Sequence, residues 1–428
     1  MIGITWMLII FFALLLLRAP ISVALCTSAM VYFLLSGQPF EFVAQRIVAG
    51  VDSFPLMAIP LFVLAGTAMA RGGIASANLE FADTLVGHWR GGLAQVNVLN
   101  SVFMGGMTGS AVADAATDAK VLVPVMIRKG YSNEFSSALS AASGIIAPLI
   151  PPGIGLVLYA LTVQESVGRL FLGSLIPALL IALVMSVTVN LVARHRGFRS
   201  DRTRRARGKE IWKAFIRALP ALGMPFLLIV GLRMGMFTPT ELAALAAAYS
   251  LIVGAFIYRK INFKNLPAIF REAVVASGMV MLLIGGGAAF GNAMIRERVP
   301  QKVAGLLTSL SDNWMVILII INVLLLILGM IMDGSMLIIM LAPLLAVATA
   351  QLGIDPIHFG VLMVINITIG GITPPAGVVL LSVVGITKAP MGKSFMEMVP
   401  FLIGSIGVLF LVSFVPDIIL WLPNLIMG

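Results

Sequence analysis

Residues 97–126 read NVLNSVFMGGMTGSAVADAATDAKVLVPVM, and the rest of the chain is interpreted outward from this stretch. Its two ends are apolar, but its middle combines Gly105, Gly106 and Gly109 with hydroxyl and carboxylate side chains. Glycine lets a backbone unwind, and these side chains supply oxygen ligands. Irregular backbone at membrane depth survives only where it is buried in protein or lines a cavity. We therefore interpret the stretch as a membrane helix broken at a binding site.

The composition is that of a polytopic membrane protein. Of the 428 residues, 60% are hydrophobic and 11% are charged, and the mean hydropathy is +1.07. A soluble domain carries about 25% charged residues. The single cysteine, Cys26, excludes an internal disulfide framework, and the three histidines show no metal-ligand spacing. The apolar N-terminus lacks a basic region and a cleavage site, so we expect a retained first span.

The net charge of +10 is concentrated in one loop. Residues 193–213 contain nine Lys or Arg, and Arg259, Lys260 and Lys264 follow two apolar segments later. Anionic-lipid or nucleic-acid binding is one reading of such a run. We favour the other, a cytoplasmic loop that follows the positive-inside rule, and we expect no nucleic-acid partner.

Further interruptions fall in otherwise apolar segments. Residues 145–155 read IIAPLIPPGIG, and residues 365–380 read INITIGGITPPAGVVL, so neither can form a regular helix. In residues 52–73, Pro55 and Pro60 fit a re-entrant hairpin and a kinked span equally well. Residues 273–295 contain three consecutive glycines and look like the same kind of segment.

These interruptions recur at one constant offset in residue number. Pro151-Pro152 is matched by Pro374-Pro375, Pro177 by Pro400, and Gly106-Met107 by Gly329-Met330, with the same difference each time. The order of the segments is also the same in both halves. Three matches at one offset indicate an internal repeat, and interrupted segments at corresponding positions point to the binding site of a secondary transporter.

We accordingly predict an all-α membrane fold of two repeats, each with a hairpin, a broken helix and a Pro-Pro segment. The predicted division is N-terminal scaffold helices over 1–50, a first repeat over 51–193, a basic cytoplasmic loop over 194–216, scaffold helices over 217–272 and a second repeat over 273–428.

The chemistry at the breaks suggests one Na⁺ site per repeat, because carbonyl and hydroxyl oxygens suit a hard monovalent cation. The first site is predicted to use Thr108, Gly109, Ser110, Ile146, Leu149 and Pro151, and the second Asp333, Gly334, Ser335, Gly370, Gly371 and Thr373. The competing reading is that such small residues allow close helix packing. Substrate-region candidates are Asp114, Pro152, Asn366 and Pro374. We expect no other metal and no cofactor.

Each polar candidate also has a structural reading. A carboxylate in the membrane is a functional hypothesis by default, but Asp333 also precedes an apolar run as a helix N-cap would. Asp114 and Asp118 lie four residues apart on one helix face and either serve the site or pair with Lys120. Asn366 either lines the site or forms an interhelical hydrogen bond.

Four stretches of the chain resemble the large membrane subunit of tripartite ATP-independent periplasmic (TRAP) transporters. They read VDSFPLMAIPLFVLAGTAMARGGI, GGMTGSAVADAATDAKVLVPVMIRKGY, ASGIIAPLIPPGIGLVLY and INITIGGITPPAGVVLL. The resemblance implies inverted repeats, two re-entrant hairpins and an elevator movement of a transport domain against a scaffold. It also implies Thr108, Ser110, Asp114 and Asp333 at or beside the Na⁺ and substrate region. The run Thr117-Asp118-Ala119-Lys120 departs from the family pattern.

The resemblance further implies Na⁺-coupled import of an organic acid across the bacterial inner membrane. The partners would be a periplasmic substrate-binding protein and a small four-helix membrane subunit. No nucleotide-binding loop of the G-x-x-x-x-G-K-[ST] type is present, so an ion gradient must supply the energy. The alternative is a self-sufficient Na⁺- or H⁺-coupled carboxylate symporter. An enzyme is disfavoured, because the histidines flank loops and Asp333 stands alone.

Overall fold

The structure, a computed structural model, describes residues 2–17, 19–198, 200, 202, 204–233, 237–311 and 313–428. Arg199 of the predicted basic loop lies outside the described residues. Within them every regular element is a helix, which confirms the predicted all-α fold.

The N-terminal half contains the helices up to the basic loop. They are α1 (Ile2–Leu16), α2 (Ile21–Leu35), α3 (Phe40–Val51), the 3-10 helix η1 (Phe54–Met57), α4 (Ala58–Arg71), α5 (Ile74–Val86), α6 (Gly92–Thr108), α7 (Ala111–Val121), α8 (Val123–Arg128), α9 (Asn133–Ser143), the 3-10 helix η2 (Gly144–Leu149), α10 (Ile154–Val163) and α11 (Val167–Arg196).

The C-terminal half follows the loop. Its helices are α12 (Gly208–Arg233), α13 (Pro239–Ile252), the π-helix η3 (Val253–Ile257), α14 (Leu266–Arg296), α15 (Val299–Leu310), α16 (Trp314–Gly329), α17 (Gly334–Gln351), α18 (Pro356–Gly370), α19 (Val378–Thr387), α20 (Met391–Phe414) and α21 (Asp417–Met427).

Seven helices in the described part of the chain are long and apolar enough to cross a membrane, or eight if one bent pair counts as a span. The bent pair is Asn133–Leu149 with Ile154–Val163, whose two parts meet at 41°. A spanning helix needs about 20 apolar residues, and several of these exceed that length. The chain is therefore a multi-pass membrane protein.

The two segments predicted as possible hairpins are single helical spans. Residues 54–71 combine η1 and α4 into one candidate span, and Pro60 lies in the first turn of α4, where its missing N–H is not needed. At residues 52–73 the structure thus has the kinked span and not the hairpin.

The second such segment belongs to the continuous 31-residue helix α14. A Cβ on its Gly285 would press on the backbone oxygen of Ile47, and one on its Gly286 would press on Cys26 Sγ. These glycines let α2 and α3 approach closely, so the hairpin interpretation of residues 273–295 is wrong.

Helix starts recur at the offset that the prolines and glycines predict. Ala111 and Gly334 begin α7 and α17, and Asn133 and Pro356 begin α9 and α18. The starts of α5, α6, α10 and α11 match those of α15, α16, α19 and α20 within two residues. Each double proline also contains a cis peptide bond. The order of the elements is thus the same in both halves, while the inversion of the repeats stays a prediction.

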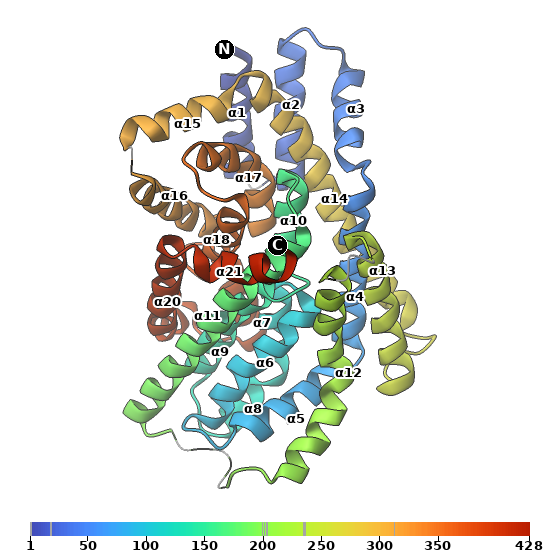
Figure 1. Ribbon diagram of the computed structural model, residues 1–428, viewed down its shortest axis with the longest axis vertical. Helices are drawn as coiled ribbons and strands as arrows, with labels where there is room; N and C mark the ends of the chain where they lie inside the picture. Colours follow the sequence, from blue (N-terminus) through green and yellow to red (C-terminus); the bar gives the residue numbers. More distant parts are fainter. Residues whose placement is uncertain are drawn as a thin grey trace.

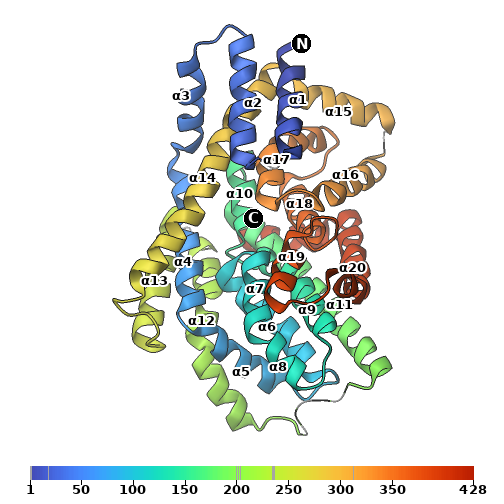
Figure 2. The ribbon, with the colours of Figure 1, turned by 180° about the vertical axis from the view of Figure 1, so that it is seen from behind.

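The broken helices occupy the centre of the molecule. Figure 1 shows α1, α2 and α3 at one end, and α5, α8 and the start of α12 at the other. Helices α4, α13 and α14 run along one side, and both views place α7, α10 and α18 in the middle (Figure 2). This arrangement encloses a cavity between α4 and α14 on one side and the broken helices on the other.

Candidate functional site

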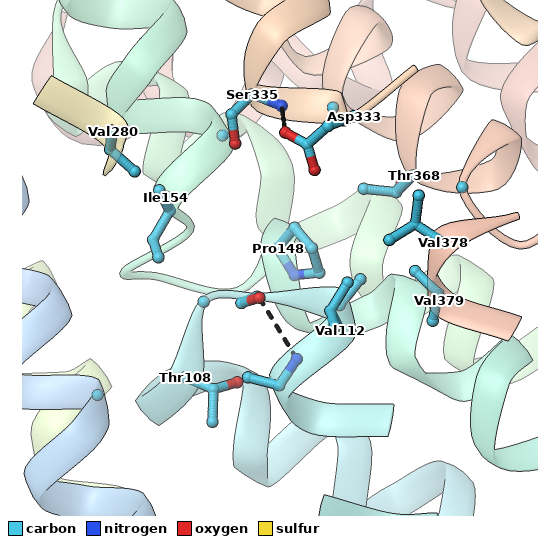
Figure 3. A pocket seen from close by; sticks show the side chains of 18 of the residues that line it. Thr108, Val112, Pro148, Ile154, Val280, Asp333, Ser335, Thr368, Val378 and Val379 are labelled. Carbon is cyan, nitrogen blue, oxygen red and sulfur yellow. Dashed lines mark hydrogen bonds between the residues drawn. The ribbon is translucent and has the colours of Figure 1, made fainter. Parts of the chain in front are cut away.

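A cavity of about 400 Å³ lies where the two broken helices meet. Thr108 and Val112 approach it from the first break, and Asp333 and Ser335 from the second, with Pro148 between them (Figure 3). The two sites predicted separately from the sequence therefore border the same space.

The first break follows from local sequence. Helix α6 ends at Thr108, and Gly109 has a φ of +56°, a left-handed conformation that favours glycine. A Cβ on Gly109 would also collide with the carbonyl oxygen of Pro152. The Ser110 hydroxyl then accepts a hydrogen bond from the Ala113 N–H at 3.4 Å and caps α7.

At the second break a helix also ends and the next one begins at a side-chain N-cap, here a charged one. Helix α16 ends at Gly329, and the Asp333 carboxylate accepts a hydrogen bond from the Ser335 N–H at 2.9 Å. Asp333 follows Ser110 at the constant offset of the repeats, so the two caps occupy equivalent positions. Asp333 is thus the N-cap of α17 and also an exposed carboxylate at the cavity, while its role as a cation ligand stays a prediction.

The Pro-Pro segments brace the two breaks in the same way. The Ile154 N–H donates to the Gly109 carbonyl at 3.2 Å, and the Ala376 N–H donates to the Met330 carbonyl at 3.0 Å. Each bond ties the segment after a double proline to the turn that interrupts the facing helix. These bonds satisfy part of the unwound backbone within the protein, which matters at membrane depth.

The electrostatics of the cavity combine two helix N-termini with hydroxyl oxygens. Helices α7 and α17 both begin at the cavity, and helix N-termini stabilise negative charge. Thr67, Thr108 and Thr368 each donate their hydroxyl proton to a carbonyl one turn earlier. Their oxygen lone pairs remain available, so these hydroxyls can act as ligands for a cation.

The charged side chains at the cavity are acidic. Asp333 and Glu272 line it, and among the described residues no Lys, Arg or His does. The Glu272 carboxylate forms an ion pair with the Arg71 guanidinium at 2.7 Å, and both side chains are about half exposed. Asp333 takes part in no ion pair in the described part of the chain. A bound anion would therefore need a cation beside Asp333.

Most of the predicted cation-site residues line the cavity, and the rest are held in the packing around it. Those at the cavity are Thr108, Gly109, Ser110, Asp333, Gly334 and Ser335, joined by Gly371 from the facing segment. Ile146, Leu149 and Pro151 are buried and do not line it. Gly370 packs against Gly329, and the Thr373 hydroxyl donates to the Ile369 carbonyl at 2.9 Å.

None of the four substrate-region candidates lines the cavity. The buried Asn366 donates to the Asn322 side-chain oxygen at 2.9 Å, which is the interhelical bond given as its structural reading. Pro152 contacts Gly109, and Pro374 belongs to the cis Pro-Pro bond between α18 and α19. Asp114 is fully buried away from the cavity.

Several cavity residues escaped the sequence analysis. Thr368 lies within the quoted stretch INITIGGITPPAGVVL, whose only other hydroxyl residue is Thr373, so it was detectable there. Thr67 and Glu272 belong to the continuous helices α4 and α14, and no sequence feature marks these two positions. Only packing against the broken helices brings them to the cavity.

Two interrupted segments that meet at one cavity beside intact spanning helices are the arrangement in which secondary transporters build their binding sites. Residues 8–418 match the family described as "Tripartite ATP-independent periplasmic transporter, DctM component", and the chain belongs to this family. The resemblance stated from the sequence is thereby confirmed.

Two relatives support this family, and one solved structure supports the fold. The chain is 36% identical to the sialic acid TRAP transporter large permease protein SiaM of Vibrio cholerae, over 96% of each chain. It is also 36% identical to the isethionate TRAP transporter permease protein DctMQ of Oleidesulfovibrio alaskensis, over 95% of this chain and 64% of that one. The structure of the Alcanivorax borkumensis YdaH transporter shares the fold, with a TM-score of 0.58 at 15% identity over 90% of each chain.

Proposed function

We propose that this large permease subunit imports an organic acid together with Na⁺. The observation that carries the proposal is the cavity itself, which offers two helix N-termini and free hydroxyl oxygens but is lined by acidic side chains. An anion alone would face the uncompensated Asp333 carboxylate, whereas an anion and one or more cations can bind there together. Obligatory joint binding is the physical basis of symport.

The substrate class rests on the same geometry. A small carboxylate or sulfonate fits N-termini that present backbone N–H groups from α7 and α17. Relatives named for sialic acid and isethionate are consistent with an anionic group as the shared feature. The particular acid would then be selected by the apolar walls, including Val112, Ile154 and Val280.

The movement we propose is an elevator. The cavity lies between the intact helices α4 and α14 and the broken helices of both repeats. A sliding of the broken helices against α4 and α14 would carry the cavity across the membrane without dismantling its two breaks. The proposed orientation places the basic segment 194–216 in the cytoplasm of a bacterium, with the chain in the inner membrane.

The proposed partners are a small four-helix membrane subunit and a periplasmic binding protein. Their support is membership of a family described as tripartite, and the longer DctMQ permease that this chain partly covers. The alternative is a self-sufficient carboxylate symporter, Na⁺- or H⁺-coupled. It is favoured by one observation only, that a complete cavity forms within this single chain.

Uptake in proteoliposomes tests the proposal. The protein is reconstituted with its small subunit, and a panel of labelled organic acids is offered under an imposed Na⁺ gradient, with and without the binding protein. We expect uptake only when both Na⁺ and the binding protein are present. Uptake with Na⁺ or H⁺ alone would support the self-sufficient symporter, and uptake that ignores every ion gradient would overturn the coupling.

A further inference from the structure

Helix α7 carries an acid pair on its buried side. Asp114 and Asp118 are one turn apart and are 0% and 1% exposed. The Asp118 carboxylate accepts hydrogen bonds from Asn100 Nδ2 at 2.8 Å and from Ser101 Oγ at 3.4 Å, both on α6. Neither oxygen of Asp114, nor Oδ1 of Asn100, has a hydrogen-bond partner among the described residues.

This cluster has more acceptors than donors. The acceptors are the two carboxylates and Asn100 Oδ1. The donors are Asn100 Nδ2 and the Ser101 hydroxyl. Lys120, considered above as a partner, is exposed, and no described salt bridge includes either aspartate. Buried carboxylates are normally paired, bound to a cation or protonated, so this imbalance is satisfied by a cation or by a proton.

The second repeat carries no acid at the corresponding positions. At the constant offset of the repeats, Leu337 and Leu341 of α17 stand where α7 has Asp114 and Asp118. The positions equivalent to Asn100 and Ser101 are also apolar, Val323 and Leu324. The polar cluster is therefore particular to the first repeat.

The acid pair is also separate from the cavity. Residues 111–113 of α7 line the cavity, whereas neither Asp114 nor Asp118 does. The pair lies between α7 and α6, on either side of the break at Gly109. A ligand there would be enclosed by the protein and would hold the two helices of the broken segment together.

We propose that Asp114, Asp118 and the Asn100 amide oxygen form an occluded binding site for a monovalent cation, Na⁺, distinct from the two break sites. All of its ligands are oxygens, which suits a hard cation. The bound ion offsets one of the two negative charges of the acid pair and ties α7 to α6, and so positions the Ser110 cap one turn away. The choice of Na⁺ rests on the proposed function.

Equilibrium binding of ²²Na⁺ to the purified full-length protein tests the site. We expect Asp114→Asn and Asp118→Asn each to bind one Na⁺ fewer per chain than the wild type. Asp355→Asn is the matched control, because it alters the N-cap of α18 away from the cavity and from the acid pair. It should bind the same number of Na⁺ ions as the wild type. Unchanged binding in both α7 variants overturns the inference but leaves the proposed function standing. A wild type that binds no Na⁺ overturns both.

A second variant guards against misfolding. The double change Asp114→Leu with Asp118→Leu copies the second repeat. We expect it to stay monodisperse, to melt at a higher temperature than the wild type in choline chloride, and to lose part of the wild-type thermal shift in NaCl. A double variant that melts below the wild type in both salts would show that the acids serve packing, and would overturn the inference.

Discussion

At the scale of single residues, the site depends on positions where few other residue types supply the backbone conformation or the charge. Gly109 combines a positive φ with contact to the Pro152 carbonyl, and Asp333 combines a helix cap with the uncompensated charge of the cavity. Each combination was visible in the sequence only as a residue type. The contacts that give each residue its role come from segments that are distant in the chain.

Gly109→Ala should lose transport and thermal stability together. A left-handed conformation costs alanine about 1–2 kcal/mol, and the collision with Pro152 adds to this cost. Gly130→Ala is the matched control, because Gly130 also has a positive φ but has open space around it. The melting temperature measures the stability of each variant, and uptake measures its transport. Equal losses in the two variants would show that the contact with Pro152 is unimportant.

Asp333→Asn should impair coupling and spare folding. Asparagine caps helices as well as aspartate does, so α17 should keep its start. Loss of a charged ligand should weaken Na⁺ affinity by about 1.5–3 kcal/mol, or roughly 10–100-fold. The Na⁺ dependence of uptake is the measurement, with Asp355→Asn as the control cap. Full activity at low Na⁺ would remove Asp333 from the mechanism.

At the scale of elements, the N-termini of α7 and α17 are the functional units. Each begins at a cavity-facing cap, and each is held by a backbone bond from the segment after a double proline. The prolines and glycines of the sequence predicted where helices stop. They did not predict that α14, with three consecutive glycines, runs unbroken, because glycine also serves close packing.

Ser110→Ala should weaken the Na⁺ response more than its loss of capping explains. Removing a serine cap costs about 1 kcal/mol of stability. Ser132→Ala removes the equivalent bond at the start of α9, from the Phe135 N–H at 3.1 Å, away from the cavity. The melting temperatures of the two variants should fall by similar amounts. Only Ser110→Ala should raise the Na⁺ concentration needed for half-maximal uptake. Matching Na⁺ responses would favour the packing interpretation of Ser110.

At the scale of the whole molecule, the cavity joins elements that the sequence separates. Val63 of α4 and Val280 of α14 line it together with residues from the interrupted segments of both repeats. If the broken helices slide as one body, contacts within that body persist during transport, and contacts to α4 and α14 change.

Cross-linking distinguishes these two kinds of contact. In a Cys26→Ser background, we expect a thiol cross-linker between Val280→Cys and Ser335→Cys to stop uptake, because it ties α14 to α17. A cross-link between Ser137→Cys and Thr387→Cys, whose hydroxyls lie 2.9 Å apart between α9 and α19 and away from the cavity, should leave most uptake intact. Undiminished uptake with the first pair linked would exclude the sliding movement.

The sequence by itself determined the all-α membrane class, the internal repeat at a constant offset and the two breaks, because composition, proline and glycine act locally on each helix. It also determined the family, through motifs that span most of the chain. Only the tertiary structure decided that both breaks share one cavity, that Glu272 and Thr67 belong to it, and that Asn366 and Asp114 do not. The physical reason is that the sequence of a regular helix shows which of its faces is buried but not which element packs against that face. The packed element decides whether a polar side chain forms a structural contact or binds a ligand.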